Sequence, residues 1–157
     1  MRHLLLITAV LFLAGCATQI DTKKEKSIYE SYIETQKLES LDKIRTFRFH
    51  GWRSLDNHYL IISTGLNNPY LIKLTNYCSD LRFAHRILVN SSGSTLTTKF
   101  DSIQVVDSSL PDRHPIKCFI KSIYKLSKEQ ADELGSLNKQ SKDKTNKEKE
   151  NNEKVEP

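Results

Sequence analysis

The sequence lacks the short motifs by which many enzymes and metal proteins are recognised. It contains no G-x-S-x-G nucleophile turn, no Walker phosphate loop, no glycine-rich dinucleotide fingerprint and no H-E-x-x-H. It also lacks C-x-x-C and the Cys/His spacings that are typical of zinc sites. We therefore predict a protein that is not an enzyme, with no catalytic residues, no metal and no other cofactor.

Two looser combinations of residue types are the alternatives to this prediction. His50, His58 and Asp101 have side chains that bind metals. Ser63, His85 and Asp101 have the types of a nucleophile, a base and an orienting acid. No two histidines share a spacing that places both on one face of a helix or strand, so we favour exposed histidines at strand ends.

No apolar run is long enough to cross a bilayer. The run Leu4–Leu13 has ten residues, whereas a transmembrane helix needs about twenty. Its length is typical of the apolar region of a secretory signal peptide. The segment that ends this run, Leu13-Ala14-Gly15-Cys16, resembles the bacterial lipobox, in which the chain is cleaved before the cysteine. The resemblance predicts a lipoprotein signal peptide over residues 1–15 and lipid attachment at Cys16.

Resemblance to bacterial lipoproteins also implies a location. Such proteins carry a diacylglyceryl group on the cysteine sulfur and usually an N-linked acyl chain such as palmitate. Several acyl chains hold a protein stably on a membrane, whereas one chain binds only marginally. Ala17 rather than Asp follows Cys16, which in lipoproteins of the enteric type goes with the outer membrane. We expect a protein that is anchored there through Cys16 and faces the periplasm.

Large apolar residues are almost missing from the end of the chain. From Ser136 onward there is no aromatic residue, and Leu137 and Val155 are the only sizeable apolar ones. A segment of this kind buries too little apolar surface to offset its ordering entropy. We therefore predict a disordered charged tail over residues 127–157, a lipid-anchored tether over 16–27, and one domain over 28–126.

Cysteine is scarce, and its number favours a disulfide. Besides Cys16 the chain contains only Cys78 and Cys118, and an even pair in an exported chain is most often a disulfide. Closing a loop of about forty residues stabilises a domain by roughly 3.5–4 kcal/mol in the chain-entropy model. The alternative is a free catalytic or metal-binding thiol.

The hydrophobic pattern predicts one helix followed by strands. Apolar residues recur three and four positions apart over residues 28–41, which is typical of an amphipathic helix. Strands are predicted at 46–49, 59–63, 70–75, 86–90, 96–100, 102–106 and 116–126. In the last of them, strict alternation would place Cys118 and Tyr124 on one inward face. The predicted fold is mainly β: a small antiparallel barrel or sandwich with one N-terminal amphipathic helix, stapled by one disulfide.

The order of several apolar and cysteine motifs resembles a known family. These motifs are Trp52-x-x-Leu55, Tyr70-Leu71-x-x-Leu74, Cys78-x-x-Leu81, Ile87, Phe100-Asp101-x-Ile103-x-Val105 and Cys118-x-Ile120-x-x-Ile123. Over roughly residues 38–126 the chain resembles small proteobacterial lipoproteins that carry a domain of unknown function. The resemblance implies a secreted, β-rich domain with a disulfide, and it implies no activity.

Two residues are candidate ligand contacts. Trp52 is the only tryptophan, and a large aromatic side chain is either a core anchor or an exposed binding anchor. Asp101 interrupts the apolar run Phe100–Val106. Its carboxylate either points outward or bonds a turn, or it contacts a ligand at the mouth of a barrel.

The net charge of +5 restricts the class of partner. The basic excess lies in the predicted domain, and in a cytosolic protein it would favour nucleic acid. Outside the cytoplasm the available polyanions are lipid headgroups, lipopolysaccharide phosphates and peptidoglycan carboxylates, so we expect no nucleic-acid partner. A solvated surface that keeps the protein soluble is the simpler interpretation.

Three hypotheses about function follow. The first is a non-catalytic docking or binding module displayed on the outer membrane, with an unknown envelope protein or anionic polymer as partner. The second is a periplasmic inhibitor of a host hydrolase such as lysozyme, similar to small lipid-anchored β-barrel inhibitors, although two basic proteins repel each other. The third is an enzyme, or a binder of a small hydrophobic ligand inside the barrel.

Overall fold

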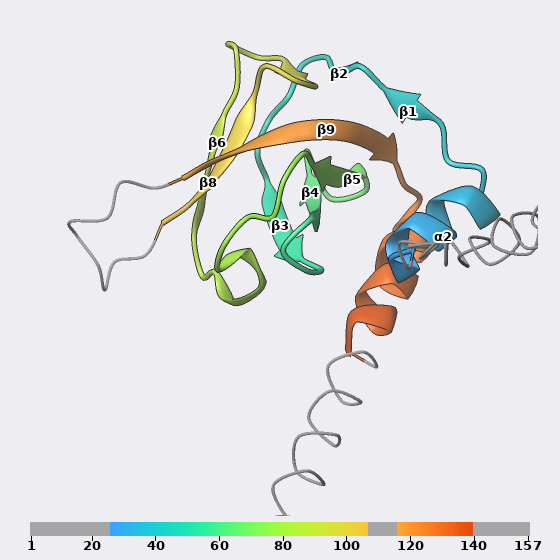
Figure 1. Ribbon diagram of the computed structural model, residues 1–157. Helices are drawn as coiled ribbons and strands as arrows, with labels where there is room; N and C mark the ends of the chain where they lie inside the picture. Colours follow the sequence, from blue (N-terminus) through green and yellow to red (C-terminus); the bar gives the residue numbers. More distant parts are fainter. Residues whose placement is uncertain (1–25, 107–115, 140–157) are drawn as a thin grey trace, which may run out of the picture.

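The computed structural model describes residues 26–106 and 116–139, which form a mainly β fold with a helix at each end (Figure 1). Helix α2 spans Ile28–Thr35, and the short 3-10 helix η1 spans Leu81–Phe83. Residues 128–139 form the last helix, called the C-terminal helix below. The strands are β1 (Ser40–Leu41), β2 (Lys43–Ile44), β3 (Gly51–Ser54), β4 (Tyr59–Ser63), β5 (Pro69–Leu74), β6 (Ile87–Asn90), β7 (Leu96–Thr97), β8 (Ser102–Val105) and β9 (Lys117–Lys125).

The main sheet is an antiparallel half-barrel. Its six-strand path runs β3-β4-β5-β9-β8-β6, and β1 also pairs with β9, while β2 and β7 form a separate two-stranded sheet. The long strand β9 pairs with β8 near its start and with β5 over the rest of its length. Within the described part of the chain, β3 and β6 each have a strand neighbour on one side only. The predicted fold class is confirmed, as a half-barrel with an N-terminal helix and a disulfide.

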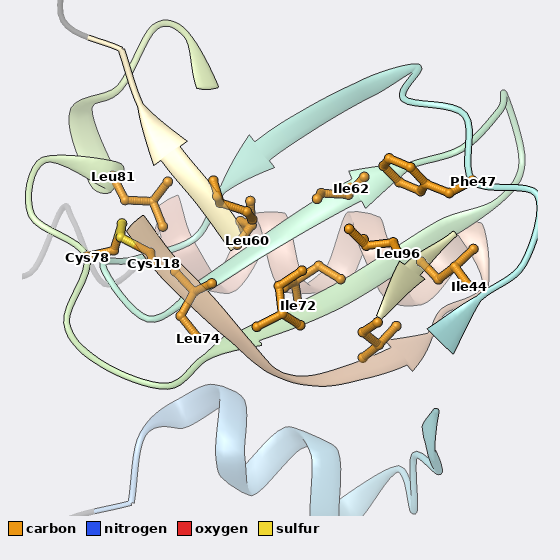
Figure 2. Close-up of a cluster of buried hydrophobic side chains, with 13 residues drawn as sticks. Ile44, Phe47, Leu60, Ile62, Ile72, Leu74, Cys78, Leu81, Leu96 and Cys118 are labelled. Atoms are coloured by element: carbon orange, nitrogen blue, oxygen red, sulfur yellow. A yellow bond between two sulfur atoms is a disulfide. The ribbon is translucent and has the colours of Figure 1, made fainter. Parts of the chain in front are cut away.

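The inner face of the half-barrel is filled by thirteen buried side chains, called the inner cluster. Figure 2 shows Phe47 and Ile44 at one end of this cluster and the Cys78–Cys118 disulfide at the other. The disulfide has a Cα–Cα distance of 5.7 Å and confirms the predicted pairing. It ties the segment between β5 and η1 to the start of β9.

One end of the opposite face of the sheet is covered by the two helices. Tyr29 and Tyr32 of α2 pack there with Ala131 and Leu134 of the C-terminal helix, in what we call the outer cluster. Leu134 is fully buried, with 0% of its surface exposed. This corrects the predicted end of the domain at residue 126, because residues 128–139 are helical and contribute to the core. The rest of the predicted tail (140–157), the signal peptide and most of the tether lie outside the described residues.

A capping box starts the C-terminal helix. The Gln130 N–H donates to Ser127 Oγ (3.2 Å), and the Ser127 N–H donates to Gln130 Oε1 (2.8 Å). This reciprocal pair satisfies two backbone donors that would otherwise lack partners at a helix start. The sequence Ser-x-x-Gln therefore marks a helix inside the segment that composition alone assigned to a tail.

The N-terminal helix ends earlier than predicted. It stops at Thr35, whereas the pattern predicted a helix to residue 41. Lys37 adopts a left-handed conformation (φ 50°), and the Leu38 N–H donates to the Ile33 carbonyl (3.0 Å). These contacts form the C-terminal motif that closes many helices, so Ser40–Leu41 is free to become β1.

Two predictions about strands are wrong. Residues 46–49 form no strand, and the edge strand is Gly51–Ser54 instead. The register between β5 and β9 shifts after Lys73, because Lys73 pairs with Ser122 and Leu74 with Ile120. The extra residue in β9 reverses its alternation. Cys118 therefore belongs to the inner cluster, while Tyr124 packs against the outer cluster.

Candidate functional site

A groove of about 280 Å³ lies between the edge strand β3 and the C-terminal helix. Strands β3 and β4 form its floor, the turn between β4 and β5 forms one rim, and the start of the C-terminal helix forms the other. Its lining residues are His50, Gly51, Trp52, Arg53, Ile61, Ser63, Gly65, Leu66, Pro69, Lys128, Ala131 and Asp132.

Arg53 joins the two sides of this groove. Its guanidinium donates a hydrogen bond of 2.5 Å to the Ala131 carbonyl and lies 3.9 Å from the Asp132 carboxylate. A Cβ atom at Gly135 would lie 2.7 Å from Arg53 Cζ. The glycine therefore leaves the space in which the guanidinium reaches the helix, and Arg53 fixes the helix against β3.

The free edge of β3 is partly covered by the same helix. Asn138 Nδ2 donates to the Ser54 carbonyl (3.1 Å), while the Leu55 N–H donates toward β4, to the Tyr59 carbonyl (3.0 Å). Because backbone groups of an antiparallel strand alternate in direction, Trp52 points its backbone N–H and C=O outward, as Ser54 does. Trp52 therefore presents an edge to which an extended chain can add.

The side chain of Trp52 is a core anchor, as one of its two interpretations expected, and its role as a binding anchor stays a prediction. Trp52 is one of the residues that line the groove, and its side chain packs, half-buried, against the inner cluster. Leu66 lies at the rim of the same groove with 87% of its surface exposed. An anchored aromatic beside an exposed aliphatic side chain is typical of a contact surface for another macromolecule.

Asp101 lies elsewhere and has internal partners. It is buried, and its two carboxylate oxygens accept hydrogen bonds from Ser92 Oγ (3.0 Å) and from the Thr97 N–H (2.5 Å). It is not among the groove's lining residues. The structure thus shows Asp101 holding the turns on either side of β7, as in the turn interpretation, and does not bring it together with Trp52.

The alternative catalytic and metal combinations are not assembled in the described residues. His50 and Ser63 both line the groove, but His85 and Asp101 do not. Across residues 26–106 and 116–139 no three His, Cys, Asp or Glu side chains are close enough to hold a metal ion. His114 and Cys16 lie outside these ranges.

A polar contact holds α2 on the sheet. Lys73 Nζ donates to the Glu30 carboxylate (2.7 Å) and lies 5.5 Å from the centre of the Tyr59 ring. Burial lowers the pKa of Lys73, but hydrogen bonds to Glu30 and Tyr59 outweigh this effect, so the pKa of Lys73 is raised overall. Burial also raises the pKa of Tyr29 to about 12, and its hydroxyl donates to the Leu55 carbonyl (3.3 Å). These groups stabilise the fold, and none of them lines the groove.

The groove residues that the sequence did not indicate all belong to the C-terminal helix or contact it. Lys128, Ala131 and Asp132 belong to the C-terminal helix, which was predicted to be a tail, and Arg53 acts by contacting that helix. The capping box was the signal that could have found them. None of the described helices is both long and apolar enough to cross a membrane.

The chain is thus a small β half-barrel, stapled by a disulfide, with a groove between β3 and the C-terminal helix. Residues 1–142 match a family of unknown function, DUF6491, and the chain belongs to this family. No curated protein and no solved structure matches the chain. The expected membership in a family of unknown function is confirmed, and its lipoprotein character stays a prediction.

Proposed function

We propose that this protein is a non-catalytic binding module whose groove receives an apolar side chain of a partner protein. The observation that carries the proposal is the groove itself, with Trp52, Arg53 and the exposed Leu66 around it. Tryptophan and arginine dominate the energetics of protein interfaces. The groove volume of about 280 Å³ lies just below the range of about 300–1,000 Å³ that is typical of pockets for drug-sized ligands. It therefore suits a side chain better than a whole small molecule.

The edge of β3 supports a protein partner. The outward backbone groups of Trp52 lie next to the groove, so an extended segment can pair with them while one of its side chains enters the groove. Main-chain pairing supplies affinity in this mode, and the groove supplies specificity. An anionic polymer has no backbone that matches a strand edge.

A ligand inside the barrel is less well supported. The inner face is packed by side chains of which most, such as Leu60, Ile72 and Ile120, are 0% exposed. A ligand in this position would have to displace the core of the domain. The hypothesis of a lysozyme inhibitor rests on size and anchoring, and no residue of the groove favours it.

We propose further that acyl chains on Cys16 hold the module on the outer membrane, facing the periplasm. The lipobox-like segment Leu13-Ala14-Gly15-Cys16 supports this location. Only nine residues separate Cys16 from Lys26, the first described residue. A chain of this length spans at most about 35 Å, so the domain would stay close to the membrane.

Capture from cells tests the binding proposal. The tagged, full-length protein is compared with Leu66→Asp, and with Phe83→Asp as a matched control, because Phe83 is also exposed (72%) and lies outside the groove. We expect one protein to be recovered with the wild type and the control but not with Leu66→Asp. Equal recovery with all three chains, or recovery of lysozyme or glycan strands in place of a protein, contradicts the groove proposal.

Fatty-acid labelling tests the anchor separately. Wild-type protein grown with labelled palmitate is expected to carry the label and to fractionate with outer membranes. Cys16→Ser is expected to lose both properties. A labelled Cys16→Ser protein, or an unlabelled wild type, contradicts the proposed anchor without affecting the groove.

A further inference from the structure

The helices cover only one end of the sheet's outer face. In Figure 1, α2 and the C-terminal helix lie near the end of β9, whereas β6 and β8 lie at its beginning. In this uncovered part, register pairs Leu88 with Gln104 and Gln104 with Lys117, while Ser102 pairs with Phe119. Because the intervening Cys118 belongs to the inner cluster, these residues lie on the outer face.

Large apolar side chains are exposed on and beside this uncovered part. Leu88 is 53% exposed and Phe119 43% exposed. Phe100, 79% exposed, lies beside β9, because the Lys99 N–H and the Asp101 carbonyl on either side of it both bond Ile120.

The charged side chains on these strands have one sign. Strands β6, β8 and β9 contain no Asp or Glu, while Lys117 and Lys121 lie on β9 and Lys99 precedes Phe100. The ion pairs between described residues use Lys26, Arg53 and Lys73 instead. Of the neighbouring acids, Asp101 bonds Ser92 and Thr97, and Glu30 bonds Lys73. The exposed Asp42 lies beside Lys99, because its carbonyl accepts from the Thr98 N–H (2.9 Å). We call Leu88, Phe119, Lys117 and Lys121, together with Lys99 and Phe100 beside β9, the basic apolar face.

We propose that the basic apolar face binds the surface of a membrane that contains anionic phospholipid. Leucine and phenylalanine enter the boundary between headgroups and acyl chains, while neighbouring lysines bind the anionic headgroups. Neither class of residue alone accounts for the face: lysines alone would favour any polyanion, and exposed apolar groups alone would favour an uncharged partner. The proposal rests on neither the groove nor the acyl group.

The start of the described chain lies on the side of the domain that this proposal turns toward the membrane. The first turn of α2 lies beside the face, because Glu30 bonds Lys73 and the charge of Lys121 helps to lower the pKa of Glu30. The described chain begins at Lys26, two residues before α2, and so starts near Lys121 of the basic apolar face. A membrane that holds Cys16 and a membrane that contacts the face can be the same surface.

Vesicle flotation tests the proposal with the unlipidated chain of residues 17–157, which includes both clusters and the disulfide. Vesicles of phosphatidylcholine alone are compared with vesicles that also contain phosphatidylglycerol. The variants are Lys117→Gln/Lys121→Gln, Leu88→Gln/Phe119→Gln, and the charge-matched control Lys37→Gln/Lys139→Gln, which lies outside both the face and the groove. Far-UV circular dichroism and thermal midpoints verify that each chain is folded.

We expect binding to the anionic vesicles only. The lysine pair is expected to weaken partitioning about thirtyfold, from a contribution of roughly fivefold for each lysine near an anionic surface. The apolar pair is expected to weaken it at least tenfold, and the control less than threefold. Absence of binding to anionic vesicles, or an equal loss in the control, overturns the proposal. An unchanged affinity of Leu88→Gln/Phe119→Gln also overturns it, because the face would then be a general polyanion site.

Discussion

The guanidinium of Arg53 occupies the space that a side chain at Gly135 would fill. A Cβ atom at residue 135 would lie 2.5 Å from Nη1 and 2.7 Å from Cζ of Arg53. Glycine within a helix costs about 1 kcal/mol relative to alanine. The sequence therefore contains an unfavourable helix residue at the position where Arg53 crosses from β3 to the C-terminal helix.

This relationship predicts a double-mutant cycle. In the wild type, Gly135→Ala displaces Arg53 from the Ala131 carbonyl, and we expect no gain or a small loss in the free energy of unfolding. In an Arg53→Ala background the same change is expected to stabilise the protein by about 1 kcal/mol, through helix propensity alone. Urea unfolding of the four chains gives the coupling free energy, and additive effects would rule out the proposed contact.

Leu134→Ala tests whether the C-terminal helix is part of the domain. Leu134 is fully buried among the residues of the outer cluster, and truncation of a buried leucine costs about 2–5 kcal/mol. Leu137→Ala, on the same helix but only partly buried, is expected to cost less than half as much. Thermal and urea unfolding check this order. If both variants changed the free energy of unfolding by less than about 0.5 kcal/mol, the range usual for surface positions, the helix would not contribute to the stability of the domain.

The disulfide is expected to supply much of the stability of this small domain. Cys78 and Cys118 are separated by 40 positions, for which the chain-entropy model gives about 4 kcal/mol. The free energy of unfolding of the variant Cys78→Ala/Cys118→Ala is therefore expected to be lower by about this amount. The reduced wild-type protein should unfold at about the same urea concentration as this variant. A loss below about 1 kcal/mol would contradict the entropic account.

Alkaline pH is expected to destabilise the outer cluster. Burial raises the pKa of Tyr29 to about 12, whereas an exposed tyrosine titrates near pH 10. The unfolded chain therefore loses its proton first, so this stabilisation is complete below about pH 10 and is lost as the pH rises toward 12. For Tyr29 the loss amounts to about 2–3 kcal/mol.

Tyr29→Phe isolates this effect. The variant lacks the hydrogen bond to the Leu55 carbonyl, so we expect it to be less stable by about 1 kcal/mol at pH 7. Between pH 10 and 12 its stability should fall less steeply than that of the wild type, since Tyr32 and Tyr59 still titrate with raised pKa values. Parallel pH profiles for the two chains would show that Tyr29 does not titrate abnormally.

The sequence predicted those features that depend on local composition. The β class, the helix start near residue 28 and the Cys78–Cys118 pairing follow from periodicity and from the number of cysteines, and all three are observed. The end of α2 and the alternation of β9 were mispredicted. Lys37 adopts a positive φ that favours glycine, and the extra residue near Lys121 fits the hydrophobic pattern only once the register with β5 is known.

The groove was harder to predict, because its parts are far apart in the sequence. Trp52 stood out as the only tryptophan, but the side chains opposite it belong to a helix in a charged segment. Averaged over residues 127–157, that segment is too polar to predict burial, although its first turns carry a capping box and two buried apolar residues, Ala131 and Leu134. The composition of residues 127–157 as a whole predicted a tail, whereas the first part of this segment, residues 128–139, forms a helix that packs on the domain.

Site-specific crosslinking in cells tests the binding proposal most directly. A photoreactive residue in place of Leu66, at the exposed rim of the groove, is compared with one in place of Phe83, which is similarly exposed outside it. We expect a crosslink to a single protein from position 66 and none from position 83. The crosslink is expected to be lost when Gly51→Pro distorts the edge of β3 in a chain shown to be folded. Equal crosslinking from both positions, or none from position 66, would contradict the account.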